Sequence, residues 1–194
     1  MKIAISGKQG SGKTTLANEF LNKYFFTKCS FANKVKEIAV DLFNLSVDEA
    51  YGENKDRVML QQIGKNMRDI DNDVWINYLI RRIKNIEQDA NRKHQHIIID
   101  DVRYKNEFDA LKKAGFIMIR IECPEEERKR RLGDCFNNPE HQSETDLDDV
   151  KHPIVKQEES DRAWDVVIVN NENISINRFK GASDKIFKIY SKND

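Results

Sequence analysis

The sequence predicts an α/β fold, a doubly wound parallel sheet flanked by helices. Short apolar segments alternate with segments of helical periodicity, as is typical of this fold class. A glycine-rich motif joins the first apolar segment to the first helical one. The segment 96–100 is apolar almost throughout, as strands buried on both faces are. With 194 residues, we expect the chain to form one domain, 1–194.

The N-terminal half begins with a strand, a glycine-rich turn and a helix. Lys2–Ser6 is short and apolar, and Thr14–Tyr24 carries Leu16, Phe20 and Leu21 at helical spacing. A second strand is expected at 28–31, followed by helices around 35–43, 55–68 and 74–86.

The C-terminal half continues the alternation but is interrupted once. Gly115 is placed to end a helix around 108–114, and Pro124 to begin a short, arginine-rich helix at 125–132. Residues 133–160 hold few large apolar side chains, which predicts a loop-rich insertion. The remaining elements are strands at 96–100, 116–122 and 166–169 and one C-terminal helix with Phe179, Ala182, Ile186, Phe187 and Tyr190 on one face.

Composition limits the partners and the compartment. Lys plus Arg and Asp plus Glu number 33 each, so no net charge attracts the chain to nucleic acid or an anionic membrane. The three cysteines are odd in number and widely spaced, and no secretory signal or membrane-length apolar run is visible. We therefore expect a soluble, cytoplasmic protein with small-molecule partners; a homodimer is left open.

The motif Gly7-x-x-x-x-Gly12-Lys13-Thr14 predicts a phosphate-binding loop for ATP and Mg²⁺. Its glycines let backbone N–H groups converge on phosphate, Lys13 adds a cation, and the Thr14 hydroxyl is offered to Mg²⁺. The residues expected to bind the cofactor are Gly7, Gly10, Ser11, Gly12, Lys13, Thr14 and Thr15.

Two aspartates end the buried strand that is expected to lie beside this loop. A carboxylate at the carboxyl end of a parallel strand can orient Mg²⁺ waters, and we expect Asp101 to do so. Asp100 or Asp101 could instead cap the next helix. Arg103 lies two residues further on and carries a planar fork suited to phosphate.

The segment Asp101-Val102-Arg103-Tyr104-Lys105-Asn106-Glu107, taken with the phosphate loop, resembles the bacteriophage-type deoxynucleoside monophosphate kinases, within the P-loop nucleoside monophosphate kinase family. Asp100 departs from the Thr or Ser expected before the strand-end aspartate, and Asn33-Lys34 from the more usual Asp-Pro. Further matching pieces are Ser30-Phe31-Ala32 with Lys36-Glu37, Arg57-x-x-Leu60-Gln61-Gln62-x-Gly64-x-x-x-Arg68 with Trp75, and His141-x-Ser143-Glu144-x-x-Leu147.

The resemblance implies a five-stranded sheet in the order 2-3-1-4-5, an acceptor-binding region at about 32–90 and a lid at about 125–160. It also implies transfer of the ATP γ-phosphate to a deoxynucleoside monophosphate, in a host cytoplasm if the chain is phage-encoded. Lys13, Asp101, Arg103, Arg128 and Arg131 would act on the transferring group. The acceptor would be bound by Arg57, Gln61 or Gln62, Arg68, Trp75, Ser143 and Glu144.

Several of these residues have ordinary structural readings as well. Arg128 and Arg131 share a helix face, but the arginines of 125–132 can also pair with Glu125, Glu126 and Glu127. Ser143-x-x-Asp146 can be a capping box, Trp75 a core residue, and Asn170 part of a turn rather than of an adenine site.

Two rival functions remain open at this point. The first is a kinase of another phosphomonoester such as phosphomevalonate, because that enzyme shares the Asp-x-Arg and Ser-Glu features. The second is a nucleotide-dependent regulatory ATPase, which would have little need of a second arginine set at Arg57 and Arg68.

Overall fold

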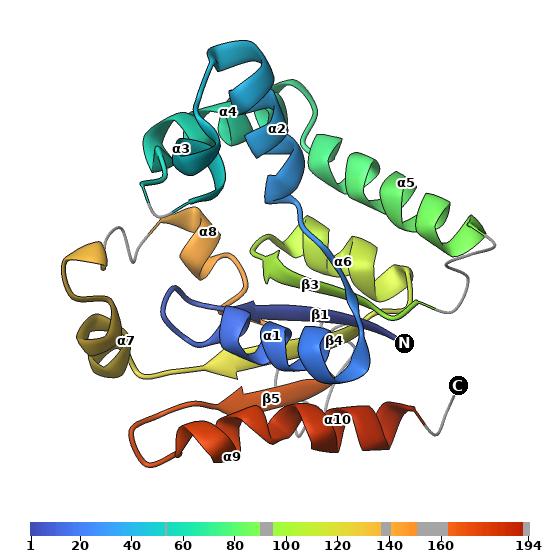
Figure 1. The fold of residues 1–194 in the computed structure, drawn as a ribbon, viewed down its shortest axis with the longest axis vertical. Coiled ribbons are helices and arrows are strands. Elements are labelled where there is room, and N and C mark those ends of the chain that lie inside the picture. The colour runs from blue at the N-terminus through green and yellow to red at the C-terminus, as the bar shows by residue number, and fades with distance from the viewer. Residues whose placement is uncertain (53, 90–94, 137–140, 151–162, 192–194) are drawn as a thin grey trace. The chain divides into compact units, whose positions relative to one another are not determined.

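A computed structural model describes residues 1–52, 54–89, 95–136, 141–150 and 163–191 (Figure 1). Five strands form one sheet in the order β2-β3-β1-β4-β5, and β1 pairs in parallel with both β3 and β4. The predicted fold class and strand order are therefore confirmed. The chain divides into two compact units, which we call the sheet unit (1–28 and 94–194) and the helical unit (29–93).

The sheet unit contains most of the predicted elements within a residue or two of their expected bounds. Its strands, with β2 running one residue into the helical unit, are β1 (Lys2–Gly7), β2 (Thr27–Cys29), β3 (Ile97–Val102), β4 (Ile117–Glu122) and β5 (Val166–Val169). Its helices are α1 (Lys13–Tyr24), α6 (Lys105–Lys113), α7 (Glu125–Leu132), the 3-10 turn η1 (Gly133–Cys135), α8 (Gln142–Thr145), α9 (Ile176–Lys180) and α10 (Ala182–Tyr190).

The centre of the sheet is buried from both faces. Ile3, Ala4 and Ile5 of β1 and Ile97–Ile99 of β3 are at most 1% exposed, as expected for strands covered by helices on both sides. Phe20 of α1 joins the same core cluster. Helix α1 also contacts α9 and α10, and Tyr24 at the end of α1 stacks on Phe187 of α10 (Figure 1).

The single C-terminal helix predicted from the sequence is wrong, because Gly181 separates α9 from α10. Glycine is among the poorest helix formers, and the Ser183 hydroxyl donates a hydrogen bond to the carbonyl of Lys180 at 2.8 Å. That carbonyl would otherwise serve a continuous helix. The second strand was also placed late, since β2 is Thr27–Cys29.

The helical unit contains α2 (Ala32–Phe43), α3 (Val47–Tyr51), α4 (Arg57–Ile70) and α5 (Val74–Gln88). The side chain of Asp56 accepts a hydrogen bond from the N–H of Met59, so α4 begins after Asp56 and not at 55. Helix α3 was not expected from the sequence; it starts at a capping box formed by Ser46 and Glu49. In the described ranges, no helix has the length and apolar character needed to span a bilayer.

Candidate active site

The phosphate loop connects β1 to α1 and turns at glycines that no other residue could replace without strain. Gly12 has a φ of +105°, and a Cβ placed there would lie 2.7 Å from Asn170 Nδ2 and 3.0 Å from the Phe179 ring. Asn170 is buried and donates from Nδ2 to the carbonyl of Ser11 at 2.8 Å. The segment after β5 is thus packed directly onto the loop.

Lys13 is folded back onto the loop that it follows. Its ammonium donates to the carbonyl of Gly7 at 2.6 Å and to that of Lys8 at 3.0 Å. Burial lowers the pKa of Lys13 to about 8, and the nearby charge of Arg103 acts in the same direction. An anion bound at this loop would restore the charged form, because it would replace the solvation that burial removes.

The start of α1 fits a phosphate group and Mg²⁺. Its N-cap residue, Gly12, has no side-chain capping hydrogen bond, so the first turn presents N–H groups that an anion can accept from. Ser11 Oγ is the single buried side-chain polar atom without a hydrogen-bond partner in the described part of the chain. Thr14 is exposed in the first turn, where its hydroxyl can ligate a cation.

The two aspartates at the end of β3 differ in their surroundings. Asp100 is 7% exposed, its Oδ2 lies 2.7 Å from the Lys28 ammonium, and its charge raises the pKa of Lys13 against the effect of burial. Asp101 is partly exposed at the same strand end. Asp100 therefore carries an ion pair inside the sheet unit, which leaves Asp101 as the more accessible carboxylate.

Arg103 and the phosphate loop meet at one carboxylate. Glu144 of α8 forms an ion pair with Arg103, and its other oxygen accepts from the Gln9 N–H at 2.6 Å. The backbone N–H of Arg103 donates to Glu107 Oε2 at 2.8 Å, and Glu107 is only 2% exposed. The structure thus brings Arg103, Glu144 and the phosphate loop together, with Glu107 fixing the backbone of Arg103.

Helix α7 contributes both predicted arginines to the loop. Arg128 is 3% exposed and donates to the carbonyls of Cys123 and Gln9, and its guanidinium lies 5.4 Å from the Phe136 ring centroid. Arg131 donates to the Gly10 carbonyl and to Asn170 Oδ1, each at 3.3 Å. Both side chains therefore already have structural contacts.

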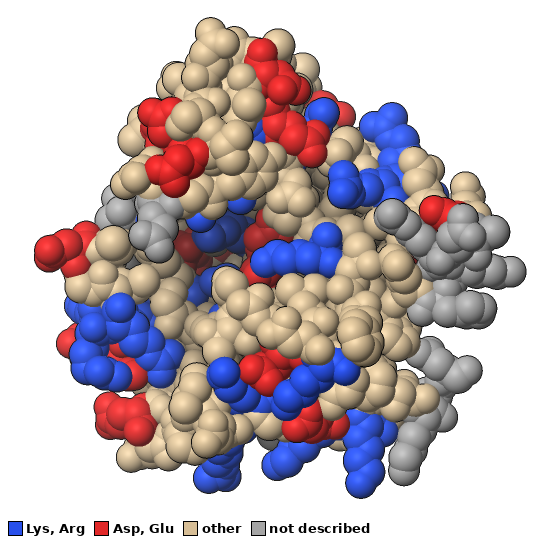
Figure 2. All heavy atoms as spheres, in the orientation of Figure 1, with Lys and Arg blue, Asp and Glu red and all other residues tan. Residues whose placement is uncertain are grey.

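The alternative reading of α7 as a helix of internal ion pairs also holds. Lys129 pairs with Glu125 and Glu126. Hydrogen bonds from Arg130 and then Arg131 lower the pKa of Glu127 to about 2. Figure 2 shows lysine and arginine side chains gathered over α7 with acidic side chains beside them.

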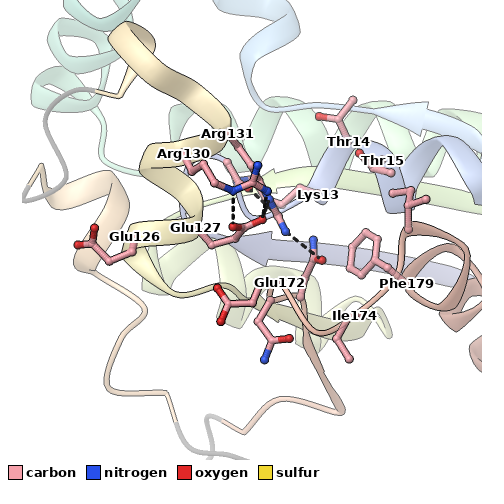
Figure 3. Close-up of a pocket in the computed structure, with 15 residues that line it drawn as sticks. Lys13, Thr14, Thr15, Glu126, Glu127, Arg130, Arg131, Glu172, Ile174 and Phe179 are labelled. Carbon is pink, nitrogen blue, oxygen red and sulfur yellow. Dashed lines mark hydrogen bonds and ion pairs between the residues drawn. The ribbon is translucent and has the colours of Figure 1, made fainter.

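A cavity of about 720 Å³ opens beside the phosphate loop, between α7 and the segment after β5. Arg130 and Arg131 lie on one side of it and Ile174 and Phe179 on the other, with Lys13 between them (Figure 3). Gly10, Gly12, Thr14 and Thr15 complete its wall near the loop. The cavity combines apolar and guanidinium surfaces, which suits a flat aromatic base.

The predicted acceptor residues of the helical unit lie mostly on α4. Successive helical residues advance by about 100°, so Gln61 lies about 40° and Arg68 about 20° from the direction of Arg57. Gln62 lies about 140° away, on a different side of the helix. Arg57, Gln61 and Arg68 thus share one face of α4 (Arg57–Ile70).

Trp75 is a core residue, which is one of the two alternatives left open by the sequence. It is 3% exposed, and its indole N–H donates to the carbonyl of Gly64 at 3.1 Å. Arg68 Nη1 donates to the same carbonyl at 3.3 Å. Trp75 therefore packs in the core of the helical unit and supports the helix that carries Arg68.

The predicted lid is described only in part, since 137–140 and 151–160 lie outside the described residues. The capping box suggested for Ser143 and Asp146 is wrong, because α8 begins two residues earlier than that box requires and is capped by His141, whose Nδ1 accepts from the Ser143 N–H. Asp146 instead accepts from the Lys105 N–H at 2.7 Å.

Arg120 is a site residue that the sequence did not reveal; it lies on β4 opposite Ser6 of β1, directly before the phosphate loop. Its side chain is 11% exposed, pairs with Asp148 at 2.8 Å and donates to Ser6 Oγ at 3.3 Å. Its guanidinium lies 5.6 Å from the ring of Trp164, which is itself buried. A charged residue inside an otherwise apolar strand was the available signal.

Known proteins resemble this chain in sequence and in fold. The family described as the AAA domain matches residues 3–152. A protein of Acanthamoeba polyphaga mimivirus named "Putative deoxynucleotide monophosphate kinase" is 30% identical over 192 residues, which covers 89% of each chain. The resemblance stated from the sequence is thereby confirmed.

Two solved kinase structures share the fold. One is a sugar kinase from Janibacter sp. HTCC2649, with a TM-score of 0.53, 16% identity and coverage of 97% of this chain and 95% of that one. The other is shikimate kinase from Acinetobacter baumannii, with a TM-score of 0.53, 15% identity and coverage of 100% and 94%. At these identities the likeness concerns the fold alone.

Proposed function

The chain belongs to the AAA domain family and is a P-loop kinase, and we propose that it transfers the γ-phosphoryl group of ATP to a deoxynucleoside monophosphate. The observation that carries this proposal is a second set of cationic side chains suited to phosphate, Arg57 and Arg68, on one face of α4 together with Gln61. A nucleotide switch needs the loop but has no use for that set. The viral relative's name agrees with the proposal.

The donor half of the site would bind ATP through the loop and the cavity beside it. The phosphates would accept hydrogen bonds from the loop and the first turn of α1, and Lys13 would face them as a cation. Thr14 and Asp101 would hold Mg²⁺, which would neutralise charge on the β- and γ-phosphates. The adenine would lie between Arg131 and Phe179 in the cavity of about 720 Å³.

The acceptor half would use α4. Arg57 and Arg68 would bind the monophosphate, and Gln61, on the same face, would hydrogen-bond the base or sugar. Trp75 would act indirectly, by holding the carbonyl of Gly64 that Arg68 also contacts.

No catalytic base is required for this reaction. The second ionisation of a phosphomonoester lies near pH 6, so the acceptor is mostly a dianion at neutral pH. The side chains would align the two phosphates and neutralise charge on the passing group, with Arg103 and the arginines of α7 supplying cations. Exclusion of water by the lid would suppress hydrolysis of ATP.

The test is a product assay with ATP, Mg²⁺ and one acceptor at a time. We expect a deoxynucleoside diphosphate and ADP in equal amounts from at least one of the four deoxynucleoside monophosphates, and none with Lys13→Met. Ribonucleoside monophosphates and phosphomevalonate serve as comparison acceptors. A phosphorylated product from phosphomevalonate alone, or ADP without any phosphorylated acceptor, would contradict the proposal.

A further inference from the structure

One short segment bears a row of carboxylates that bind the cationic groups around the phosphate loop. We call residues 141–150 the acidic strap. Its four carboxylates accept six polar contacts from other parts of the sheet unit, and its Leu147 and Val150 are buried. Glu144 bonds to Gln9 and Arg103, Asp146 to the Lys105 N–H, Asp148 to Lys8 and Arg120, and Asp149 to the Lys105 ammonium.

Glu144 differs from the other strap carboxylates in burial and in partners. Its side chain is 8% exposed, whereas those of Asp148 and Asp149 are 41% and 68% exposed. Its two oxygens bind different donors, a backbone N–H of the phosphate loop and a guanidinium. Its charge also reaches Lys13, whose pKa it raises against the effect of burial.

The groups that hold Glu144 are of the kinds that bind phosphate. Backbone N–H groups of a glycine-rich loop, a lysine and an arginine fork are the usual partners of a phosphoryl group. The Gln9 N–H cannot donate a full hydrogen bond to Glu144 and to a phosphoryl oxygen at the same time. The Arg103 guanidinium would likewise have to divide its hydrogen bonds between Glu144 and the phosphoryl group. Two anions so close together would also repel each other.

We propose that Glu144 is an internal stand-in for a phosphoryl group, which occupies the phosphate loop before nucleotide binds and is displaced by the incoming triphosphate. Donor binding is then coupled to release of the acidic strap from the loop. This inference rests on the proposed function only in taking a nucleoside triphosphate as the donor, and the nature of the acceptor does not enter it.

The proposal has a thermodynamic consequence. When an internal group competes for the site, the apparent affinity for the triphosphate equals the intrinsic affinity multiplied by the fraction of molecules in which the site is open. Removal of the Glu144 carboxylate should therefore tighten binding, although it removes a partner of Arg103. A structural role for Glu144 predicts the opposite, because loss of the Arg103 contact would loosen the site.

The test compares Glu144→Ala with the control Asp148→Asn. The control also removes one negative charge from the acidic strap, but the wild-type Asp148 side chain contacts Lys8 and Arg120 instead of Gln9 and Arg103. The probe is a non-hydrolysable ATP analogue with Mg²⁺, measured by calorimetry. We expect Glu144→Ala to bind about five- to tenfold more tightly, a difference of order RT ln 10 or less, and Asp148→Asn to stay within about twofold of wild type. Unchanged or weaker binding by Glu144→Ala, or an equal gain in both variants, would overturn the proposal.

Hydrogen exchange on the wild-type protein provides a second measurement that needs no variant. The Glu144 N–H donates to the His141 carbonyl and the Asp146 N–H to that of Gln142, so both amides report on the strap. The analogue should speed exchange of these amides while it slows exchange at Gln9. Equal or greater protection of the strap in the bound state would also overturn the proposal.

These measurements separate the inference from the proposed function. Neither of them contains an acceptor. A protein that phosphorylates no deoxynucleoside monophosphate but shows both results would retain the inference and lose the function. A protein that makes the deoxynucleoside diphosphate, but whose Glu144→Ala variant binds the ATP analogue no more tightly than wild type, would retain the function and lose the inference.

Discussion

The ammonium of Lys13 lies 2.6 Å from the carbonyl oxygen of Gly7, the residue that opens its own loop. The Lys13 side chain is therefore bonded to carbonyls of its own loop. If ATP binds as proposed above, phosphate oxygens would replace these two backbone carbonyls around the Lys13 ammonium. Because burial lowers the pKa of Lys13 to about 8, we expect nucleotide binding to change the protonation of this side chain.

We predict proton uptake when the ATP analogue binds near pH 8. At that pH about half of Lys13 is neutral in the free protein, and bound phosphate should return its pKa toward the ordinary value near 10.5. Up to about half a proton per site should be taken up at pH 8 and much less at pH 7. Calorimetry in buffers of different ionisation enthalpy measures this number.

Lys13→Arg is the matched control for the proton measurement, since arginine carries the charge without titrating. It should bind the analogue with no uptake in the same pH range. Uptake of equal size in Lys13→Arg would assign the proton to another group.

We predict that substitution of Asp100 lowers stability, whereas substitution of Asp101, at the same end of β3, weakens the response to Mg²⁺. Asp100→Asn breaks an ion pair in which Asp100 is buried and Lys28 is 37% exposed, so the free energy of unfolding should fall by about 1–3 kcal/mol, from the loss at the buried partner. Asp101→Asn should instead raise the Mg²⁺ concentration needed for half-maximal activity, with a smaller change in the melting temperature. If Asp100→Asn alone shifted the Mg²⁺ dependence, the assignment would be reversed.

We predict that position on α4 separates two adjacent glutamines. Arg68→Ala and Gln61→Ala should raise the acceptor KM by about tenfold or more, while the KM for ATP changes less than threefold. Gln62→Ala changes the same residue type one position away and off the shared face, so it should leave both constants near wild type. Steady-state kinetics with each substrate varied in turn decides the point. Equal effects of Gln61→Ala and Gln62→Ala would contradict the assignment of acceptor binding to the α4 face that carries Gln61.

We predict that Gly12 tolerates no side chain. Gly12→Ala would place a Cβ 2.7 Å from Asn170 Nδ2 at a φ of +105°, so it should lower stability by about 2–4 kcal/mol and weaken nucleotide binding. Gly133→Ala is the control, because Gly133 also has a positive φ but no atom lies within 4 Å of its added Cβ. It should cost only the backbone strain, about 1 kcal/mol. Thermal melts compare the two, and equal losses would show that the packing contact has no effect.

Local signals predicted the fold well where they agreed with the tertiary structure. Pro124 and the charge pattern fixed α7 at the residues found, Glu125–Leu132, and the phosphate loop fixed the junction of β1 and α1. The missed helix α3 had a readable signal, Ser46-x-x-Glu49. The break at Gly181 coincides with a side-chain hydrogen bond from Ser183 to the carbonyl of Lys180, which periodicity does not reveal.

The site was harder to predict because its decisive contacts join distant parts of the chain. Glu144 and Gln9 are separated by 135 residues, and no spacing rule brings a carboxylate onto a particular backbone N–H across that distance. The choice between Gln61 and Gln62 needed the helix phase of α4, which follows only once its bounds are known. The position of a single strand residue such as Arg120 relative to the site depends on which residue of the neighbouring strand lies opposite it, here Ser6.

The two tryptophans offer an optical consequence. Trp75 is 3% exposed in the helical unit and Trp164 is 2% exposed in the sheet unit, and the sequence contains no others. Trp164→Phe would leave one indole that emits from the helical unit alone, and Trp75→Phe one that emits from the sheet unit alone. Fluorescence of the two variants in rising denaturant would show whether the units melt together or in sequence, each seen without the other.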